Sequence, residues 1–174
     1  MRALKTVTFI YEPREDRIAA AINVGAPDAW SCWLTRRLAL ALLERASDFV
    51  AHTSTMAQHT PSELRNEFIA FERDAAIATT SKAMTITPPE VLKTSVTAAV
   101  LADKLQITAE RGGFHLELHA QRDDGAAGVL TRPELQRMLQ MLQDVVGKAG
   151  WLAAPATPQA AATGEAPAAK TLRH

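Results

Sequence analysis

Two stretches near the start of the chain alternate apolar and polar side chains. Residues 5–13 alternate valine, phenylalanine and tyrosine with threonine and isoleucine, and residues 17–24 repeat the alternation. A period of two predicts half-buried strands, and the segment between them, Pro-Arg-Glu-Asp, predicts a turn. The short run 29–33 (Ala-Trp-Ser-Cys-Trp) predicts a third strand.

From Thr35 the apolar period changes to that of a helix. The apolar positions that fall at helical spacing are Leu38, Leu42, Leu43, Ala46, Phe49 and Val50. This spacing predicts an amphipathic helix that ends near residue 52.

A second helix is predicted over residues 61–81. Thr60 is suited to capping it, Pro61 to its first turn, and Glu63 completes a capping box. Its apolar positions form one stripe, which predicts that the helix faces the core: Leu64, Phe68, Phe71 and Ala75.

The second half of the chain contains the clearest hairpin. Two alternating runs, 104–110 and 114–121, flank a glycine pair that can adopt positive φ. Residues 122–128 predict a loop. Thr131 with Glu134 three positions later predicts a capped helix that ends near Gly147 or Gly150.

A shift of 96 positions relates the two halves. Leu-Thr-Arg at 34–36 recurs at 130–132, and the apolar phase agrees without a gap from residue 9 to residue 50. We therefore expect two pseudo-equivalent β-β(-β)-α units, 5–53 and 101–149, packed together because neither closes a core alone.

The predicted fold class is α+β: an antiparallel sheet from these two units, joined by the helix at 61–81. Residues 1–151 are expected to form one domain. The segment 152–174 is rich in alanine and proline and has few apolar anchors, which predicts a disordered tail.

Composition and charge exclude several classes. Lysine plus arginine equals aspartate plus glutamate, 19 of each, so net charge gives no support for nucleic acid or an anionic membrane as partner. A single cysteine excludes an intrachain disulfide. Without a predicted signal sequence or membrane span, the expectation is a cytoplasmic protein with no membrane partner.

The segment around the only cysteine is the first candidate site. Trp30, Trp33, Arg36 and Arg37 have the composition of a protein-interaction surface, because tryptophan and arginine are enriched in interface hot spots. Cys32 precedes a helix start and two arginines, which permits a reactive thiol, although a lone cysteine is more often a small buried apolar residue.

Arg36 and its counterpart Arg132 raise a question of charge. A cation in the first turn of a helix opposes the helix dipole, so each arginine requires a compensating partner. The sequence suggests Asp28 for Arg36 and Asp124 for Arg132.

A second candidate site lies in the hairpin. His115, Glu117 and His119 alternate and so share one face of a strand, and this set of side chains can bind zinc or iron. The two histidines are about 13 Å apart along an extended strand, too far to bind one ion without bending. A polar, solvated strand face is the favoured interpretation.

No catalytic or cofactor motif is recognisable, so we predict no cofactor. The favoured function is a non-catalytic protein-interaction module: an accessory or assembly factor, or a subunit of a larger complex, with a protein partner or a second copy. One alternative is a regulatory protein that binds nucleic acid or a small ligand, with nucleic acid not favoured. The other is an enzyme that uses Cys32 or the metal site His115/Glu117/His119.

Overall fold

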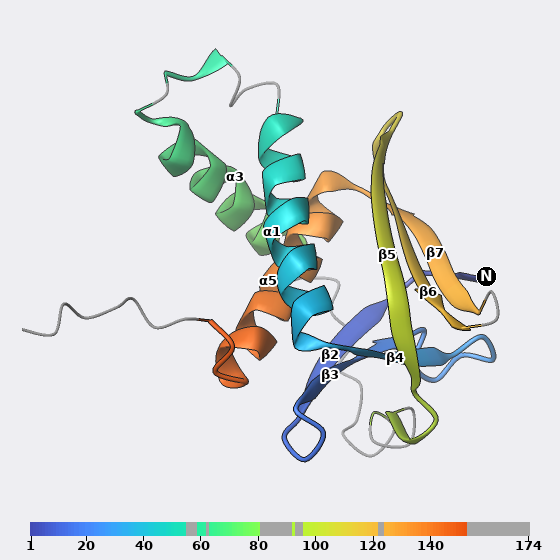
Figure 1. The fold of residues 1–174 in the computed structure, drawn as a ribbon. Coiled ribbons are helices and arrows are strands. Elements are labelled where there is room, and N and C mark those ends of the chain that lie inside the picture. Colours follow the sequence, from blue (N-terminus) through green and yellow to red (C-terminus); the bar gives the residue numbers. More distant parts are fainter. Residues whose placement is uncertain (55–58, 62, 81–91, 93–95, 122–123, 153–174) are drawn as a thin grey trace, which may run out of the picture.

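The computed structural model describes residues 1–54, 59–61, 63–80, 92, 96–121 and 124–152. Figure 1 shows the helices of this part of the chain gathered on one side of a strongly curved sheet. The elements in chain order are β1 (Arg2–Ala3), β2 (Val7–Glu12), β3 (Arg17–Ile22), β4 (Trp30–Leu34), α1 (Arg36–His52), α3 (Arg65–Thr80), β5 (Val100–Glu110), β6 (Gly113–Ala120), β7 (Gly125–Leu130) and α5 (Arg132–Lys148).

The α+β class is confirmed, but the sheet is mixed rather than antiparallel. Its seven strands follow the order β1-β7-β6-β5-β4-β3-β2. Each half is an antiparallel meander, whereas β4 pairs with β5, and β1 with β7, in parallel. A parallel pair needs a long crossover, and the chain between β4 and β5, which includes α1 and α3, provides one.

The two edge strands of the sheet, β1 and β2, are consecutive in the chain. The backbone N–H of Leu4 still bonds to Ala127 on β7, while the carbonyl of Thr6 already accepts from Asn23, just after β3. Only Lys5 separates these contacts, so the sheet curls until its two edges are neighbours.

The two halves pair in closely similar registers. Ile18 faces Leu34 between β3 and β4, and 96 positions later Phe114 faces Leu130 between β6 and β7. The first hairpin of each half differs, because Tyr11 faces Ile18 whereas Ile107 faces Leu116. The constant shift therefore fails by two positions at the first strand, where the turn after β2 is longer than the turn after β5.

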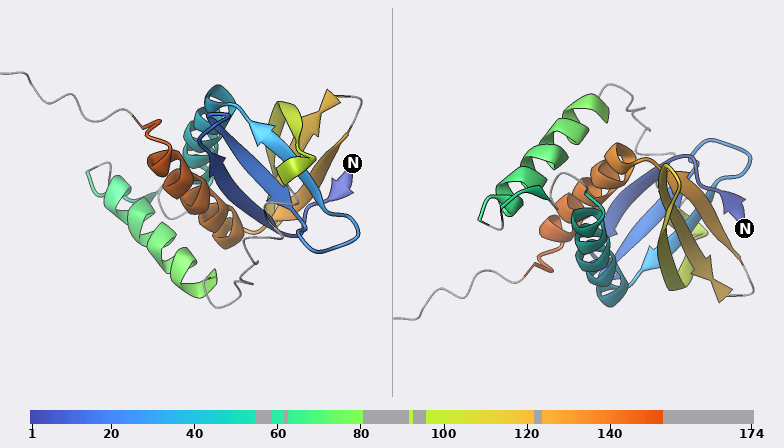
Figure 2. Two further views of the ribbon diagram at one scale, coloured as in Figure 1. Left: turned by 90° about the horizontal axis from the view of Figure 1, so that it is seen from below. Right: turned by 90° about the horizontal axis from the view of Figure 1, so that it is seen from above.

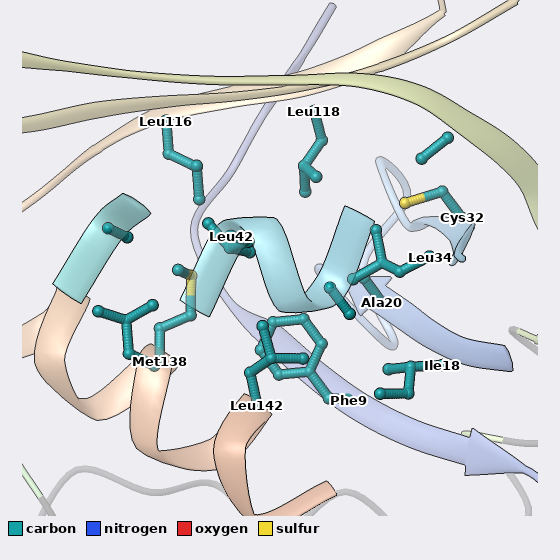
Figure 3. Close-up of a cluster of buried hydrophobic side chains, with 14 of the residues drawn as sticks. Phe9, Ile18, Ala20, Cys32, Leu34, Leu42, Leu116, Leu118, Met138 and Leu142 are labelled. Atoms are coloured by element: carbon teal, nitrogen blue, oxygen red, sulfur yellow. The ribbon is translucent and has the colours of Figure 1, made fainter. Parts of the chain in front are cut away.

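The core lies between the two halves of the sheet and the helices α1 and α5. Figure 3 shows Leu42 of α1 between Leu116 and Leu118 of β6 on one side and Phe9 of β2 on the other. Burying one such leucine contributes about 1.5–3 kcal/mol to the free energy of unfolding. The views in Figure 2 place α3 on the outer side of α5, away from the strands.

The structure corrects the predicted loop at 122–128. Residues 125–130 form β7, between β6 and β1. Its glycines are sites of close backbone approach rather than of a loop: a Cβ on Gly125 would lie 2.2 Å from the Leu118 carbonyl oxygen, and one on Gly128 would lie 2.5 Å from that of Leu4.

The predicted linking helix is present but begins later, at Arg65, after a turn in which the N–H of Leu64 bonds to Pro61. Its orientation is also corrected: α3 packs against α5 through the side that carries buried Ala76, while Leu64, Phe71 and Ala75 are exposed. The predicted disordered tail lies, apart from Leu152, outside the described residues.

Candidate functional site

The strand β4 places the two tryptophans of the first candidate site on opposite faces. Trp30 points into the core and is 8% exposed, and its indole Nε1 donates to Asp124 Oδ2 at 3.1 Å. The guanidinium of Arg2 lies over its ring at 5.9 Å. Trp33 is half-buried on the outer face, beside Leu101 of β5.

Cys32 lies on the inward face of the same strand, between β3 and β5. Its side chain is fully buried, and this burial raises the pKa of the thiol to about 12. The thiol is therefore protonated at neutral pH, and these surroundings do not supply the lowered pKa that a reactive cysteine requires.

Arg36 and Arg132 each reach the C-terminal end of the other half's helix. The guanidinium of Arg36 donates to the carbonyl of Trp151, just after α5, at 3.2 Å. That of Arg132 donates to the carbonyl of Val50 at 2.8 Å and to Thr53 Oγ1 at 3.0 Å, at the end of α1. Each cation thus lies at the negative end of a neighbouring helix dipole, which offsets its unfavourable position at the start of its own helix.

The aspartates suggested as partners of these arginines have other contacts. Asp28 accepts from the side chain of Asn23 at 3.1 Å and lies 3.6 Å from Lys5 Nζ. Asp124 forms an ion pair with Arg2 and accepts from Trp30. Both carboxylates therefore bind the N-terminal segment to the sheet, and the pairings expected for the two arginines are replaced by helix-end contacts.

Arg132 also connects α3 to the rest of the molecule. Its Nε lies 3.7 Å from Glu72 Oε1 on α3, and Ser54 Oγ donates to the other oxygen of this carboxylate at 3.0 Å. The cation further lies over the ring of Phe114 at 5.5 Å. Glu72 therefore fixes which face of α3 turns inward, a constraint that the apolar pattern of the helix does not contain.

The second candidate site forms a row on the outer face of β6. The carboxylate of Glu117 contacts both histidines. His119 Nε2 lies 2.8 Å from Glu117 Oε2, and His115 Nδ1 lies 3.5 Å from Glu117 Oε1. His115 is also 3.7 Å from Glu110. In the described part of the chain, no group of three such side chains has the geometry to hold a metal ion. The row is thus an arrangement of polar contacts on a half-buried strand face.

Large apolar side chains are exposed on α3 and in the turn that leads into it. Phe71 of α3 is 70% exposed, and Leu64, directly before the helix, is 52% exposed. Sequence reasoning identified this stripe but assigned it to the core. The signal that distinguishes the two cases is the carboxylate Glu72, which contacts Arg132 and so determines which side of α3 turns inward.

Comparison of the chain with family models, with curated proteins and with solved structures gives no match. Among the helices in the described ranges, none is long and apolar enough to cross a membrane. What the chain does must therefore be inferred from its own geometry.

Proposed function

We propose that the protein is a non-catalytic interaction module that binds a protein partner through the outward face of α3. The observation that carries this proposal is the exposure of Phe71 on α3, and of Leu64 in the turn before it, while the helix packs against α5 through the side that carries Ala76. Grouped exposed apolar side chains are uncommon on soluble domains unless a partner covers them.

The anchoring of α3 supports a preformed binding surface. Glu72 contacts Arg132 and Ser54, which lie near the start of α5 and the end of α1. Because these contacts hold the helix from its inner side, Phe71 is presented outward without a further conformational change. Aromatic anchors of this kind dominate the energetics of protein interfaces.

The predicted surface at the β4–α1 junction remains part of the proposal in reduced form. Trp30 is buried and Arg36 bonds to Trp151, which leaves Trp33 and Arg37. Trp33 is half-buried beside Leu101, which is 43% exposed. This patch offers a partner a second, smaller apolar contact.

We also propose that the two strand-strand-strand-helix units are pseudo-equivalent copies. Thr35 and Thr131, 96 positions apart, are both helix N-caps whose hydroxyls accept from an amide three residues on. The matching register of β3–β4 and β6–β7 and the reciprocal contacts of Arg36 and Arg132 support this proposal. A paired body of this kind suits a module whose two halves support different surfaces.

The test compares two exposed apolar side chains on opposite parts of the molecule. Phe71→Asp is predicted to abolish co-purification of a defined partner from the cells that produce the protein. Val129→Asp on β7 is the matched control, because Val129 is also more than half exposed. Mass spectrometry of the purified complexes is the measurement. A partner retained by Phe71→Asp, or lost equally from both variants, would contradict the assignment to α3.

A further inference from the structure

A groove with a volume of about 370 Å³ runs between α1 and β5. The helix contributes Leu38, Leu42 and Phe49 to its lining, and the strand contributes Leu105 and Ile107. Its size is within the range of small-ligand sites, about 300–1,000 Å³. The groove lies on a different part of the molecule from the exposed face of α3.

The topology explains why this groove exists. The parallel pairing of β4 with β5 covers only Cys32–Val100 and Trp33–Leu101. The chain then enters α1, which continues beside the rest of β5. In the other half, α5 follows β7 in the same way but packs directly against β2. The contact of helix with strand is therefore closed in one half and open in the other.

The edge of β5 that faces α1 is an open strand edge. β6 pairs with one side of β5 along its length, and β4 pairs with the other side only at Val100 and Leu101. Beyond Leu101, no strand among the described residues pairs with this second side. Its backbone amides and carbonyls consequently face the groove. Unpaired strand edges of this length are templates for the addition of another strand.

Arg45 is the one charged residue that lines the groove. Its side chain is exposed, and no ion pair joins it to a carboxylate in the described ranges. The groove therefore combines an apolar lining, an open backbone edge and a single available cation.

We propose that this groove binds an extended peptide, which adds a strand to the edge of β5 and carries an acidic group next to Arg45. Apolar side chains at alternate positions of such a peptide face Leu42, Phe49 and Ile107, while its backbone bonds to β5. A lipid or fatty acid satisfies the apolar lining and Arg45 but leaves the strand edge unpaired, so the open edge favours a peptide. This inference goes beyond the partner proposed for α3 and does not depend on it.

The first test selects ligands from a displayed library of random peptides of about seven residues, the length of a short strand. The full chain is the target, and enriched peptides are measured by fluorescence polarisation. Ala41→Trp fills the groove from α1, and Arg45→Glu reverses its charge; each is expected to weaken binding by about tenfold or more. Arg14→Glu, which reverses the charge of an exposed arginine in the turn after β2, outside the groove, is the matched control and leaves affinity unchanged.

The second test asks whether the bound peptide pairs as a strand. Amide hydrogen exchange over residues 103–110 is expected to slow on binding of an enriched peptide. Two N-methylated versions of that peptide are then compared, one methylated at odd-numbered and the other at even-numbered residues. Only one of them is expected to bind, because every second amide of an added strand donates to β5. Exchange that stays unchanged, no enrichment, or enriched peptides that bind Ala41→Trp normally would overturn the proposal. Saturable binding of decanoate without any peptide binding would also overturn it, as would a groove filled by a second copy, seen as a dimer that Ala41→Trp dissociates. The Phe71→Asp variant keeps peptide binding if the two surfaces are independent.

Discussion

The side chain of Asn23 lies at the corner where the N-terminal segment changes its pairing from β7 to β3. Its Oδ1 accepts from the backbone N–H groups of Lys5 and Thr6, at 3.0 and 3.2 Å, and its Nδ2 donates to the Ala3 carbonyl at 2.6 Å. Asn23 itself has a φ of 51°, in the left-handed region that asparagine tolerates better than most residues. One buried amide thus satisfies three backbone groups that the sheet leaves unpaired.

Replacing Asn23 separates these two roles. Asn23→Gly keeps the backbone conformation but removes these three hydrogen bonds and the one to Asp28, and we expect it to lower the free energy of unfolding by about 2–3 kcal/mol. Asn23→Ala adds the cost of positive φ and is expected to lose about 1 kcal/mol more. Urea unfolding followed by circular dichroism measures both values. Equal stability of the two variants would show that φ at this position costs nothing.

At the scale of elements, α1 and α5 stabilise each other through their ends. Arg132 makes two hydrogen bonds to the end of α1 and approaches Glu72 on α3, whereas Arg36 makes one hydrogen bond to Trp151. The two arginines therefore occupy equivalent positions, but Arg132 makes more contacts than Arg36.

This difference predicts unequal effects of two alanine substitutions. Arg132→Ala is expected to lower the free energy of unfolding by about 2–3 kcal/mol, because it leaves the end of α1 and Glu72 without their cationic partner. Arg36→Ala is expected to cost about 1 kcal/mol or less. Arg37→Ala, the exposed neighbour, serves as control with a change within about 0.5 kcal/mol. Chemical denaturation of the three variants is the measurement, and a larger loss for Arg36→Ala than for Arg132→Ala would refute it.

Elements with a local signal were predictable from the sequence. The first and second hairpins follow from alternation, and both helix starts follow from Thr35 and Thr131, whose capping depends on neighbours three residues away. β7 was not predictable because its glycines are required by neighbouring strands: Gly125 by the backbone of Leu118 on β6, and Gly128 by the backbone of Leu4, at the other end of the chain. The parallel β4–β5 pair likewise depends on contacts across the whole linking segment.

The candidate sites show the same division. That Trp30 and Trp33 lie on opposite faces follows from the period of a strand, but which of them is buried depends on Asp124 and Arg2. The exposure of Phe71 depends on the ion pair of Glu72 with Arg132, 60 positions later in the chain (132 minus 72). Neither partner is encoded in the local pattern.

At the scale of the whole molecule, two carboxylates join distant parts of the chain through tryptophans. Hydrogen bonds from Trp151 and Tyr11 lower the pKa of Asp16, and those from Arg2 and Trp30 lower the pKa of Asp124. A carboxyl whose pKa is lower in the folded than in the unfolded chain contributes stability above its unfolded pKa, and this contribution is lost as the pH falls through its folded pKa.

The protein is therefore expected to lose stability on acidification, beginning below about pH 5. Asp124→Asn is expected to be less stable than the original chain at pH 7, with a difference that disappears at low pH, and Asp16→Asn is expected to behave alike. Urea midpoints between pH 7 and pH 2, followed by tryptophan fluorescence, test this. A difference that stays constant across this range would rule out a role for the ionised carboxylates.

The consecutive edge strands also constrain the order in which the fold can form. Arg2 and Asp124 form an ion pair although 122 positions separate them, and β1 has no strand to pair with until β7 exists. During synthesis on the ribosome, residues 2–3 emerge early and then wait while almost all the described strands and helices are made. Contacts of such long sequence separation form slowly, because the intervening chain must be ordered first. Closure of the sheet is thus a late event in folding, and until then the edge of β7 that later pairs with β1 is open to pairing with other molecules.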